Sequence, residues 1–399
     1  MVKVAVFGYG TVGSGAVEVM VKNREEIKKR NGIDLEVKYI LDLRDFPGDP
    51  MEDKVVHDVE TILNDPEVAV ICETMGGVNP AYTFTKRALE AGKSVCTSNK
   101  ELVAAKGPEL LEIAKANNAT YLFEASVGGG IPIIRPILTC LTAEKIEKIQ
   151  GILNGTTNYI LTKMSDEGAD YAEVLKQAQE LGYAEKDPTA DVEGHDACRK
   201  IAILSSLAMG KTVNYEDIHT EGISKITTAD FAFAKKCGLQ IKLIGMSKMT
   251  EEGNFAIVSP RLVDAKSPLA CVQDVFNGIL VTGNMLGDSM YYGRGAGKLP
   301  TASAVVGDVI EEAKNVGKNI PIQWTSEAAS LKDYKELSQR YLVRVKGTDE
   351  AALSKAFPGC EMIRVEEVAD EVAVLTEEMK ESAYDQAVQG LSVVSMIRM

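Results

Sequence analysis

The stretch VKVAVFGYGTVGSGAVEVM, residues 2–20, reads as an apolar strand, a glycine turn and a helix. Gly8, Gly10 and Gly13 form the pattern GxGxxG within it. The first glycine permits a tight turn, the second lets the backbone approach a pyrophosphate, and the third lets the helix pack on the strand. The start of the helix adds free N–H groups and a positive dipole end. Because the pattern lies between a strand and a helix, it predicts a dinucleotide-binding site.

Further apolar strands alternate with helical patterns along the first part of the chain. They are LEVKYIL (35–41), VAVICETMG (68–76) and KSVCTSN (93–99). Such alternation predicts an α/β fold with a Rossmann-type, doubly wound parallel sheet, whose ligand crevice lies beyond the carboxyl ends of the strands. Lys100 follows one strand end, where it is either a catalytic lysine or an ordinary surface lysine.

Two charged residues follow the second strand, and they favour different cofactors. An acidic residue there binds the ribose hydroxyls of NAD, whereas an arginine accepts the extra phosphate of NADP. The sequence offers both Asp42 and Arg44. Because the strand ends nearby, we expect Arg44 to swing free, which favours NADP slightly and leaves NAD as a usable cofactor.

Composition excludes several classes of protein. The chain has 399 residues, 45% of them hydrophobic and 26% charged, with a net charge of −14 that argues against nucleic acid as a partner. No apolar stretch is long enough for a membrane-spanning helix, and Met1 leads directly into a strand, so we expect neither a membrane anchor nor a signal peptide. Seven cysteines without a CxxC pair predict reduced thiols and a cytoplasmic location.

The segment AEKDPTADVEGHDACRKIAILSSLA (184–208) runs from a charged stretch into an apolar one. On a helix, Asp196 and Lys200 are four residues apart and their side chains meet. Their line continues on the flank of the apolar stripe, so the pair is expected to be half-buried, with Arg199 in solvent. The pair is either an ordinary ion pair or part of a substrate site.

Two other glycine-rich turns follow the first domain. Gly128–Gly130, in YLFEASVGGGIPIIRPI (121–137), either turns carbonyl oxygens inward, so that with Glu124 they could hold a hard cation, or forms a flexible loop between domains. Gly295 and Gly297, in YYGRGAGKLPTASAVVGDVI (291–310), form either an anion cradle or a helix start that needs glycine.

Six motifs together resemble the homoserine dehydrogenase family. In chain order they are FGYGTVGSG, TSNKELVA, EASVGGGIP, GILNGTTNYIL, LGYAEKDPTADVEGHDACRKIAIL and YYGRGAGKLPTASAVVGDV, spread over residues 1–330. The resemblance implies reversible reduction of L-aspartate 4-semialdehyde to L-homoserine with NADPH or NADH, in threonine and methionine biosynthesis. The ammonium of an amino-acid aldehyde needs carboxylates, which the acidic segment supplies. The alkoxide formed by hydride transfer needs a proton donor, which a lysine can provide.

The resemblance also implies roles for individual residues. The catalytic residues are Lys100 and Lys200. The substrate-binding residues are Thr156, Tyr183, Glu185, Asp191 and Asp196. The cofactor-binding residues are Gly8, Gly10, Thr11, Val12, Gly13, Asp42, Arg44, Thr74, Gly76, Ser98, Lys100, Gly295 and Gly297. A monovalent cation, Na⁺ or K⁺, is bound by Glu124 and by the carbonyls of Val127, Gly129 and Ile131.

The rest of the chain is divided by pattern. Residues 1–130 with 301–330 are expected to form the dinucleotide-binding domain, 131–300 an α+β domain for substrate binding and dimerisation, and 335–399 a ferredoxin-like tail. The tail's predicted βαββαβ order resembles the ACT regulatory domain, with a structural role as the alternative to effector binding. The expected partners are a small-molecule amino-acid substrate and further copies of the chain, in a homodimer or a higher homo-oligomer. Rival functions are another semialdehyde oxidoreductase, which would need a nucleophilic cysteine, and a non-catalytic amino-acid sensor.

Overall fold

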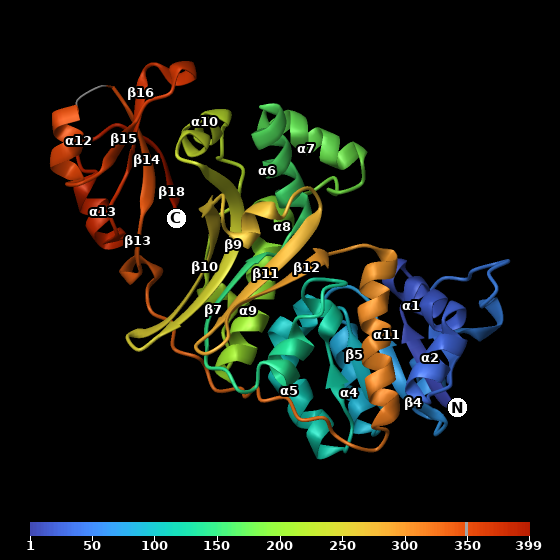
Figure 1. Ribbon diagram of the computed structural model, residues 1–399. Coiled ribbons are helices and arrows are strands. Elements are labelled where there is room, and N and C mark those ends of the chain that lie inside the picture. The colour runs from blue at the N-terminus through green and yellow to red at the C-terminus, as the bar shows by residue number, and fades with distance from the viewer. Residues whose placement is uncertain (348–349) are drawn as a thin grey trace. The chain divides into compact units, whose positions relative to one another are not determined.

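The computed structural model describes residues 1–347 and 350–399 (Figure 1). Contacts divide the chain into two compact units, the first comprising 1–143, 202–214 and 293–329, and the second 144–201, 215–292 and 330–399. Over the described ranges, no helix has the length and apolar character needed to cross a bilayer.

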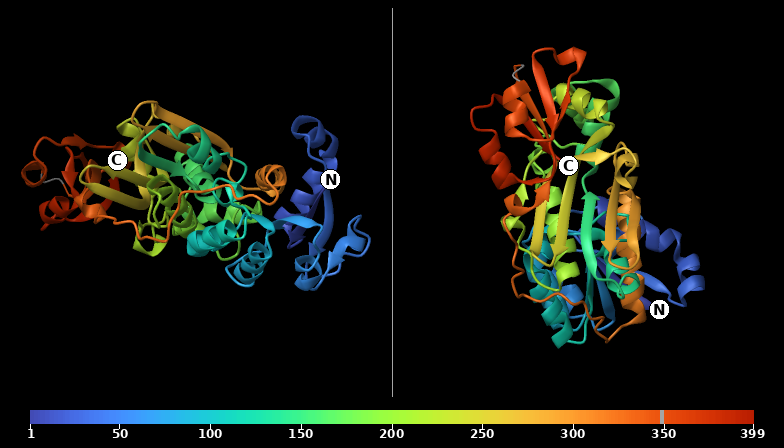
Figure 2. Two further views of the ribbon diagram at one scale, coloured as in Figure 1. Left: turned by 90° about the horizontal axis from the view of Figure 1, so that it is seen from below. Right: turned by 60° about the vertical axis from the view of Figure 1, so that its left-hand side comes forward.

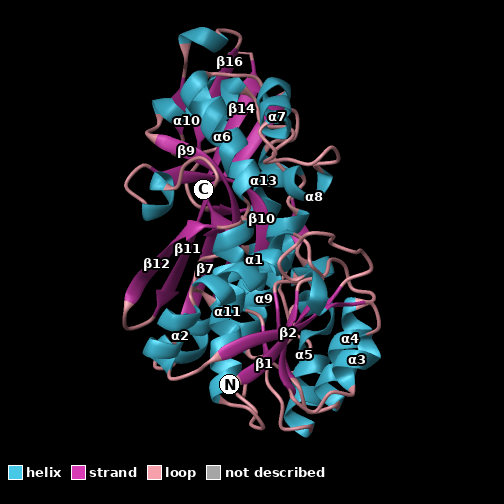
Figure 3. Ribbon diagram, turned by 90° about the vertical axis from the view of Figure 1, so that its right-hand side faces the viewer, coloured by secondary structure: helices cyan, strands magenta, loops and turns pink. Residues whose placement is uncertain are grey.

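The first unit is built on a six-stranded parallel sheet in the order β3-β2-β1-β4-β5-β6. Its strands are β1 (Val2–Phe7), β2 (Leu35–Leu41), β3 (Val55–Val56), β4 (Val68–Glu73), β5 (Ser94–Thr97) and β6 (Tyr121–Leu122). Its helices are α1 (Thr11–Lys22), α2 (Arg24–Asn31), α3 (Val59–Leu63), α4 (Ala81–Glu90), α5 (Lys100–Ala116) and α11 (Lys298–Lys314). Figure 3 shows these helices packed around the strands. The strand order is that of dinucleotide-binding folds, which confirms the predicted doubly wound sheet.

Strand β1 is buried on both faces, and helix α1, which follows it, packs closely against α11. Val4, Val6 and Phe7 have no exposed surface, as expected of a parallel strand covered on both faces. A Cβ on Gly15 would lie 2.9 Å from the carbonyl oxygen of Lys298, so this glycine lets α1 approach α11. The crevice between β1 and β4 is the point where the strand order reverses.

The second unit contains a longer, mixed sheet in the order β12-β11-β7-β9-β10-β18-β14-β16-β15, with β8 beside β10. Its first strands are β7 (Ile146–Ile152), β8 (His219–Thr220), β9 (Leu239–Thr250), β10 (Gly253–Asp264), β11 (Phe276–Gly283) and β12 (Gly287–Arg294). Its helices include α6 (Gly155–Glu167), α7 (Tyr171–Glu180), α8 (Thr189–Val192), α9 (His195–Met209, which begins in this unit) and α10 (Thr228–Lys236). This mixture of sheet and helices agrees with the predicted α+β character of the segment.

The longer elements of the tail follow the predicted βαββαβ order, and two short strands that pair with each other, β13 and β17, are added to it. It comprises β13 (Ser338–Gln339), β14 (Tyr341–Lys346), α12 (Glu350–Ala356), β15 (Glu361–Ile363), β16 (Glu371–Leu375), β17 (Met379–Lys380), α13 (Glu381–Ala387) and β18 (Val393–Arg398). Its four main strands are antiparallel in the order β18-β14-β16-β15, which is ferredoxin-like. Not foreseen was the pairing of β18 with β10 at Arg398 and Arg261, which joins the tail to the longer sheet (Figure 2).

Helix α6 is fixed to a neighbouring loop by a buried lysine and an asparagine. The Asn158 amide donates hydrogen bonds to the carbonyls of Val272, Asp274 and Phe276 at 2.9–3.2 Å. The Lys242 ammonium, only 2% exposed, donates to the Val272 carbonyl at 2.6 Å and to the Asn158 side-chain oxygen at 3.2 Å. Burial lowers the pKa of Lys242 from 10.5 to about 8.

This buried lysine predicts a change of stability with pH. Between pH 8 and 10.5 the unfolded chain holds the Lys242 proton more tightly than the folded chain, so the free energy of unfolding rises with pH across that window. Relative to Lys242→Met, the wild type should therefore gain about 3 kcal/mol from pH 7 to 11. Urea unfolding of both proteins at several pH values measures the difference, and a constant gap between them would contradict the prediction.

Candidate active site

The glycine turn after β1 leaves space and donors for an anion. Gly8 has a φ of +88°, and a Cβ on Gly13 would lie 1.9 Å from the carbonyl oxygen of Gly8, so both positions need glycine. A Cβ on Gly10 would meet nothing within 4 Å, and this N-cap has no side-chain hydrogen bond. The N–H groups of Thr11 and Val12 lie in the first turn of α1, where no carbonyl of the helix can accept them. A pyrophosphate fits this arrangement.

The charged pair after β2 is locked together. Arg44 donates from Nε and from a terminal nitrogen to the two oxygens of Asp42, both at 2.9 Å, and its guanidinium lies 5.1 Å from the centre of the Phe46 ring. Asp42 also accepts the Tyr9 N–H at 2.8 Å. The Arg44 guanidinium holds the pKa of Asp42 well below its usual range. The expectation that Arg44 swings free is therefore wrong, because a forked ion pair restrains it.

A buried acid that sequence reasoning missed lies at the carboxyl end of β4. Glu73 has no exposed surface, accepts the Thr97 hydroxyl at 2.5 Å and accepts the Met75 N–H at 2.7 Å. Burial raises the pKa of Glu73 to about 7. Thr74, next in the chain, donates its hydroxyl to the Phe7 and Gly8 carbonyls at 3.0 and 2.9 Å. Glu73 and Thr74 thus fix the loop that begins the predicted cofactor crevice. The sequence feature that could have identified Glu73 is an acidic residue at the end of an apolar strand.

Lys100 is the first residue of α5, and the two residues before it define its position. The Asn99 side chain caps the helix by accepting the Leu102 N–H at 3.1 Å, and its amide donates to the Gly77 carbonyl at 2.6 Å. The Ser98 N–H donates to the Glu73 carbonyl at 3.4 Å. Asn99 thereby joins the start of α5 to the loop containing Gly76, so two predicted cofactor segments share one network.

The two later glycine turns are in contact. A Cβ on Gly129, which has a φ of +53°, would lie 2.4 Å from the carbonyl oxygen of Gly295. The Gly130 N–H donates to the Arg294 carbonyl at 3.1 Å. Gly297 has a φ of +114° and is the N-cap of α11. The segment predicted to bind a cation therefore packs backbone to backbone against the turn predicted to contact the cofactor, which sequence spacing could not reveal.

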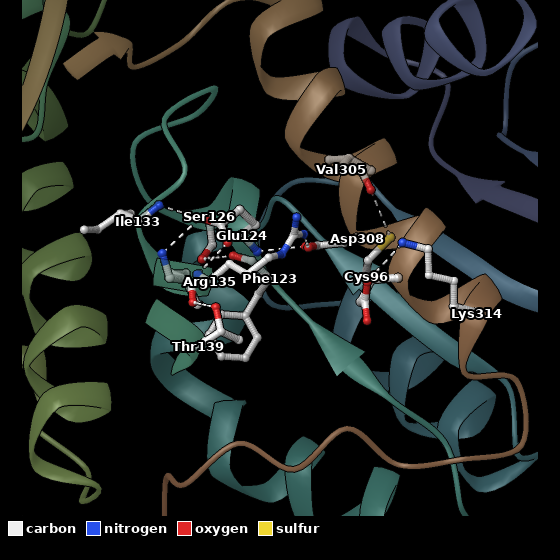
Figure 4. A network of polar contacts seen from close by, with 12 residues as sticks. Cys96, Phe123, Glu124, Ser126, Ile133, Arg135, Thr139, Val305, Asp308 and Lys314 are labelled. Atoms are coloured by element: carbon white, nitrogen blue, oxygen red, sulfur yellow. Dashed lines mark hydrogen bonds and ion pairs between the residues drawn. The ribbon is translucent and has the colours of Figure 1, made fainter. Parts of the chain in front are cut away.

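The Glu124 carboxylate is buried in a network shown in Figure 4. Its oxygens accept three backbone N–H groups, those of Ile133, Ile134 and Arg135, at 2.6, 2.9 and 2.7 Å. Asp308 of α11 accepts the Glu124 N–H at 2.8 Å and also the Arg135 guanidinium. Burial raises the pKa of Asp308 to about 7. This network fixes the 124–135 loop, and Val127 and Ile131 within it are buried.

In the second unit, one asparagine and one lysine connect two acids. The Asn154 amide donates to Asp191 Oδ1 at 2.7 Å and to Asp196 Oδ2 at 2.8 Å. Lys200 Nζ donates to the same Asp196 oxygen and to the Leu153 carbonyl, both at 2.7 Å. The Asp196 and Lys200 side chains are 8% and 11% exposed, so the pair meets as predicted but is buried more deeply than the expected half.

The other predicted substrate residues lie around this cluster at different depths. Thr156, in the first turn of α6, donates its hydroxyl to the Tyr183 carbonyl at 2.7 Å. The Tyr183 ring is 44% exposed and packs edge-on against Tyr159. Glu185 is exposed, and its backbone carbonyl accepts a hydrogen bond from Gln179 at 3.0 Å. Thr156 and Tyr183 are thus directly connected, whereas the Glu185 side chain lies outside the hydrogen-bonded cluster in the described part of the chain.

The arrangement of the second unit suits a small zwitterionic substrate. Asp191 and Asp196 offer carboxylate oxygens to an ammonium group, and Lys200 offers a proton donor beside them. Asn154 was not among the predicted site residues, although it lies in the quoted segment GILNGTTNYIL and caps α6 through its Oδ1, which accepts the Thr157 N–H at 2.9 Å.

Two family models match this chain. Residues 132–310 match the family model described as homoserine dehydrogenase, and residues 8–124 match the model described as homoserine dehydrogenase, NAD binding domain.

Individual relatives extend the match over most of the chain. A homoserine dehydrogenase of Synechocystis is 46% identical over 316 residues, which cover 77% of this chain and 72% of the relative. The structure of a homoserine dehydrogenase from Thiobacillus denitrificans superposes with a TM-score of 0.90 at 33% identity, covering 100% of this chain and 97% of that one. A hyperthermophilic archaeal homoserine dehydrogenase in complex with NADPH has a TM-score of 0.68 at 27% identity, covering 81% and 99%. The chain therefore belongs to the homoserine dehydrogenase family of NAD(P)-dependent oxidoreductases.

Proposed function

We propose that this homoserine dehydrogenase interconverts L-homoserine and L-aspartate 4-semialdehyde in threonine and methionine biosynthesis, with Asp191, Asp196 and Lys200 at the substrate. The observation that carries the proposal is the hydrogen-bonded cluster of these residues, in which two acids and a lysine are held together. Thr156, Tyr183 and Glu185 complete the substrate-binding set in this proposal, with Glu185 engaging from its exposed position.

The proton chemistry follows from the charges of the reaction. A nicotinamide cofactor held along the glycine turn after β1 would supply the hydride that reduces the aldehyde carbon. Asp191 and Asp196 bind the substrate ammonium and keep the aldehyde oriented. As negative charge develops on the aldehyde oxygen, the Lys200 ammonium donates a proton to it, and Asp196 stabilises the charged lysine until then. Lys100, at the start of α5, is proposed as the second lysine of the reaction; a surface role is its alternative.

A spectrophotometric assay of homoserine oxidation, followed by the absorbance of the reduced nicotinamide, tests the proposed function. Turnover dependent on homoserine supports it. Binding of amino acids without turnover would favour the sensor. An acylating semialdehyde dehydrogenase would need a reactive cysteine beside the cofactor. Cys72 of β4 and Cys96 of β5, which lie in the strands of the parallel sheet, are fully buried, and burial raises the pKa of the Cys96 thiol well above its usual range.

The cofactor is proposed to lie along Gly8, Gly10, Thr11, Val12 and Gly13. Asp42 and Arg44 are proposed at its adenosine ribose, with Thr74, Gly76, Ser98, Lys100, Gly295 and Gly297 along the rest of the cofactor. The open space at Gly10 and the uncapped start of α1 support the pyrophosphate position. A slight preference for NADP is supported by Arg44, whose fork of donors suits a phosphate, and by the archaeal relative solved with NADPH.

Releasing Arg44 from Asp42 is expected to change the cofactor preference. Asp42→Ala removes a negative charge and frees the guanidinium, so the ratio of kcat/KM for NADP to that for NAD should rise. Arg44→Ala should lower it, each by roughly 1–3 kcal/mol for a charge-assisted contact. Asp45→Ala is the control, because its side chain is 82% exposed and pairs with His57. If neither ratio moves, the adenosine end is recognised elsewhere.

A monovalent cation, Na⁺ or K⁺, is proposed at Glu124 and the carbonyls of Val127, Gly129 and Ile131. Carboxylate and peptide oxygens are ligands suited to hard cations, and the positive φ of Gly129 supports a loop that turns carbonyls toward one point. Both Glu124 oxygens already accept N–H groups, so the peptide carbonyls would supply most of the coordination.

Activity is then expected to depend on NaCl or KCl when choline chloride keeps the ionic strength constant. Glu124→Ala should abolish that dependence, and Glu124→Gln, which keeps an acceptor oxygen for the backbone, separates loss of charge from loss of the loop. Equal rates of the wild type in Na⁺- and K⁺-free buffer would refute the site.

We also propose the domain boundaries of the chain, its assembly, its location and the role of its tail. The domains are placed at 1–130 with 301–330, 131–300 and 335–399, with a homodimer or a higher homo-oligomer formed through the middle one. The seven unpaired cysteines support a reducing, cytoplasmic location. The ferredoxin-like strand order of the tail supports an ACT-like domain, with either an effector-binding or a purely structural role.

A further inference from the structure

We infer that Asn154 is a positioning residue for the substrate's ammonium group, because its amide holds Asp191 and Asp196 at the spacing that one ammonium can bridge. This inference rests on the proposed function and deepens it. Asn154 lies between β7 and α6, whereas Asp191 belongs to α8 and Asp196 to α9. One side chain therefore connects acids from two different helices.

The geometry of a planar amide sets the spacing. The same nitrogen of Asn154 is 2.7 Å from Asp191 Oδ1 and 2.8 Å from Asp196 Oδ2. Its two N–H bonds diverge by about 120°, which places the two acceptor oxygens about 5 Å apart. Two N–H bonds of an ammonium diverge at a nearly tetrahedral angle and reach oxygens at a similar separation. The amide thus holds the carboxylates ready for a substrate nitrogen.

The orientation of the amide is determined by its partners. Asn154 Oδ1 accepts the Thr157 N–H at 2.9 Å as the cap of α6, so the NH₂ group must face the acids. An ionised carboxylate only accepts hydrogen bonds, which requires the same orientation. Asn154 is 6% exposed and Asp196 is 5% exposed, so the hydrogen bond between them is shielded from bulk solvent, whereas Asp191 is half-buried.

Lys200 shares one oxygen of Asp196 with the Asn154 amide. Asp196 Oδ2 accepts hydrogen bonds from both Asn154 and Lys200, and Lys200 also donates to the Leu153 carbonyl. Without the amide, the connection of Asp191 to Asp196 through Asn154 is lost, whereas Lys200 keeps its hydrogen bonds to Asp196 and to the Leu153 carbonyl. Loss of Asn154 should therefore weaken substrate binding much more than proton transfer, so KM should rise more than kcat falls.

The decisive variant is Asn154→Ser, with Asn154→Thr as a second. Serine and threonine both cap helices, so α6 keeps its first-turn hydrogen bond, whereas neither can reach both acids. We expect KM for homoserine to rise by about tenfold to a hundredfold, which is the range for lost hydrogen bonds to charged groups. The factor by which kcat falls should be smaller than the factor by which KM rises. The thermal midpoint should stay close to that of the wild type. The matched control is Asp170→Ala, which removes the cap of α7 and should leave KM unchanged.

A substrate analogue separates positioning of the ammonium from general damage. The deamino analogue of homoserine lacks that group, so its inhibition constant should be the same in wild type and Asn154→Ser. Equal weakening of homoserine and the deamino analogue, or an unchanged KM for homoserine, would overturn the inference while leaving the proposed function standing. A wild-type chain that does not oxidise homoserine would refute the proposed function and the inference together.

Discussion

Lys200→Ala is expected to lower kcat for homoserine oxidation by about 10²- to 10⁴-fold, the usual range for lost acid–base assistance. The lysine is held 2.7 Å from Asp196 and its side chain is 11% exposed, so bulk water has little access to take over its proton transfer. Cofactor affinity should change little. Steady-state kinetics with saturating cofactor, together with cofactor titration by fluorescence, measure both effects.

The control for this substitution is another lysine with the same spacing on a helix. Lys163 pairs with Glu167 four residues later on α6 at 2.8 Å, but both side chains are more exposed. Lys163→Ala should leave kcat within a factor of two of the wild type, because exposed pairs contribute little. The same measurement on Lys100→Ala identifies which lysine carries the proton, and near-normal kcat in Lys200→Ala would remove Lys200 from the mechanism.

Arg344→Met is expected to destabilise the second unit by about 3–5 kcal/mol, the cost of leaving buried charges without their partner. Arg344 is 4% exposed and donates to Asp230 of α10 and to Glu371 of β16, both at 2.7 Å. Asp230 and Glu371 would remain in an environment that excludes water. The free energy of unfolding, from urea denaturation followed by circular dichroism, measures this loss.

Arg364 provides the comparison for Arg344 within the same tail. Its ion pair with Glu350 has the same 2.7 Å length, but the two side chains are 47% and 56% exposed. Arg364→Met should change the free energy of unfolding by less than about 1 kcal/mol. If Arg344→Met lowers the free energy of unfolding no more than Arg364→Met does, the buried ion pairs of Arg344 do not stabilise the second unit.

The parts of the fold that could be predicted are those that local sequence encodes. Gly8, Gly10 and Gly13 predicted the turn after β1, and the alternation of strands and helices predicted the sheet around it. The contact of Asp196 with Lys200 was also predictable, since four-residue spacing on a helix brings side chains together. The order of elements in the tail followed from its apolar patterns.

The remainder depends on contacts between segments that are distant in the chain. Asn154 could be read as a helix cap, but not as the link between Asp191 and Asp196, because that role needs the positions of three elements. The same holds for the approach of Gly129 to Gly295. The restraint of Arg44 by Asp42 was missed for a different reason, since spacing alone does not tell whether two opposite charges pair or both face a ligand.

The pairing of β18 with β10 has a consequence for biosynthesis of the protein. Chains emerge from the ribosome N-terminus first, so β10 is made long before β18 is available to cover its edge. During that interval the edge near Arg261 has unpaired backbone groups, and unpaired strand edges are sites where nascent chains aggregate. A chain truncated within the tail would therefore lack β18 and expose the unpaired edge of β10. Holdase chaperones should bind such truncated chains more strongly than complete ones.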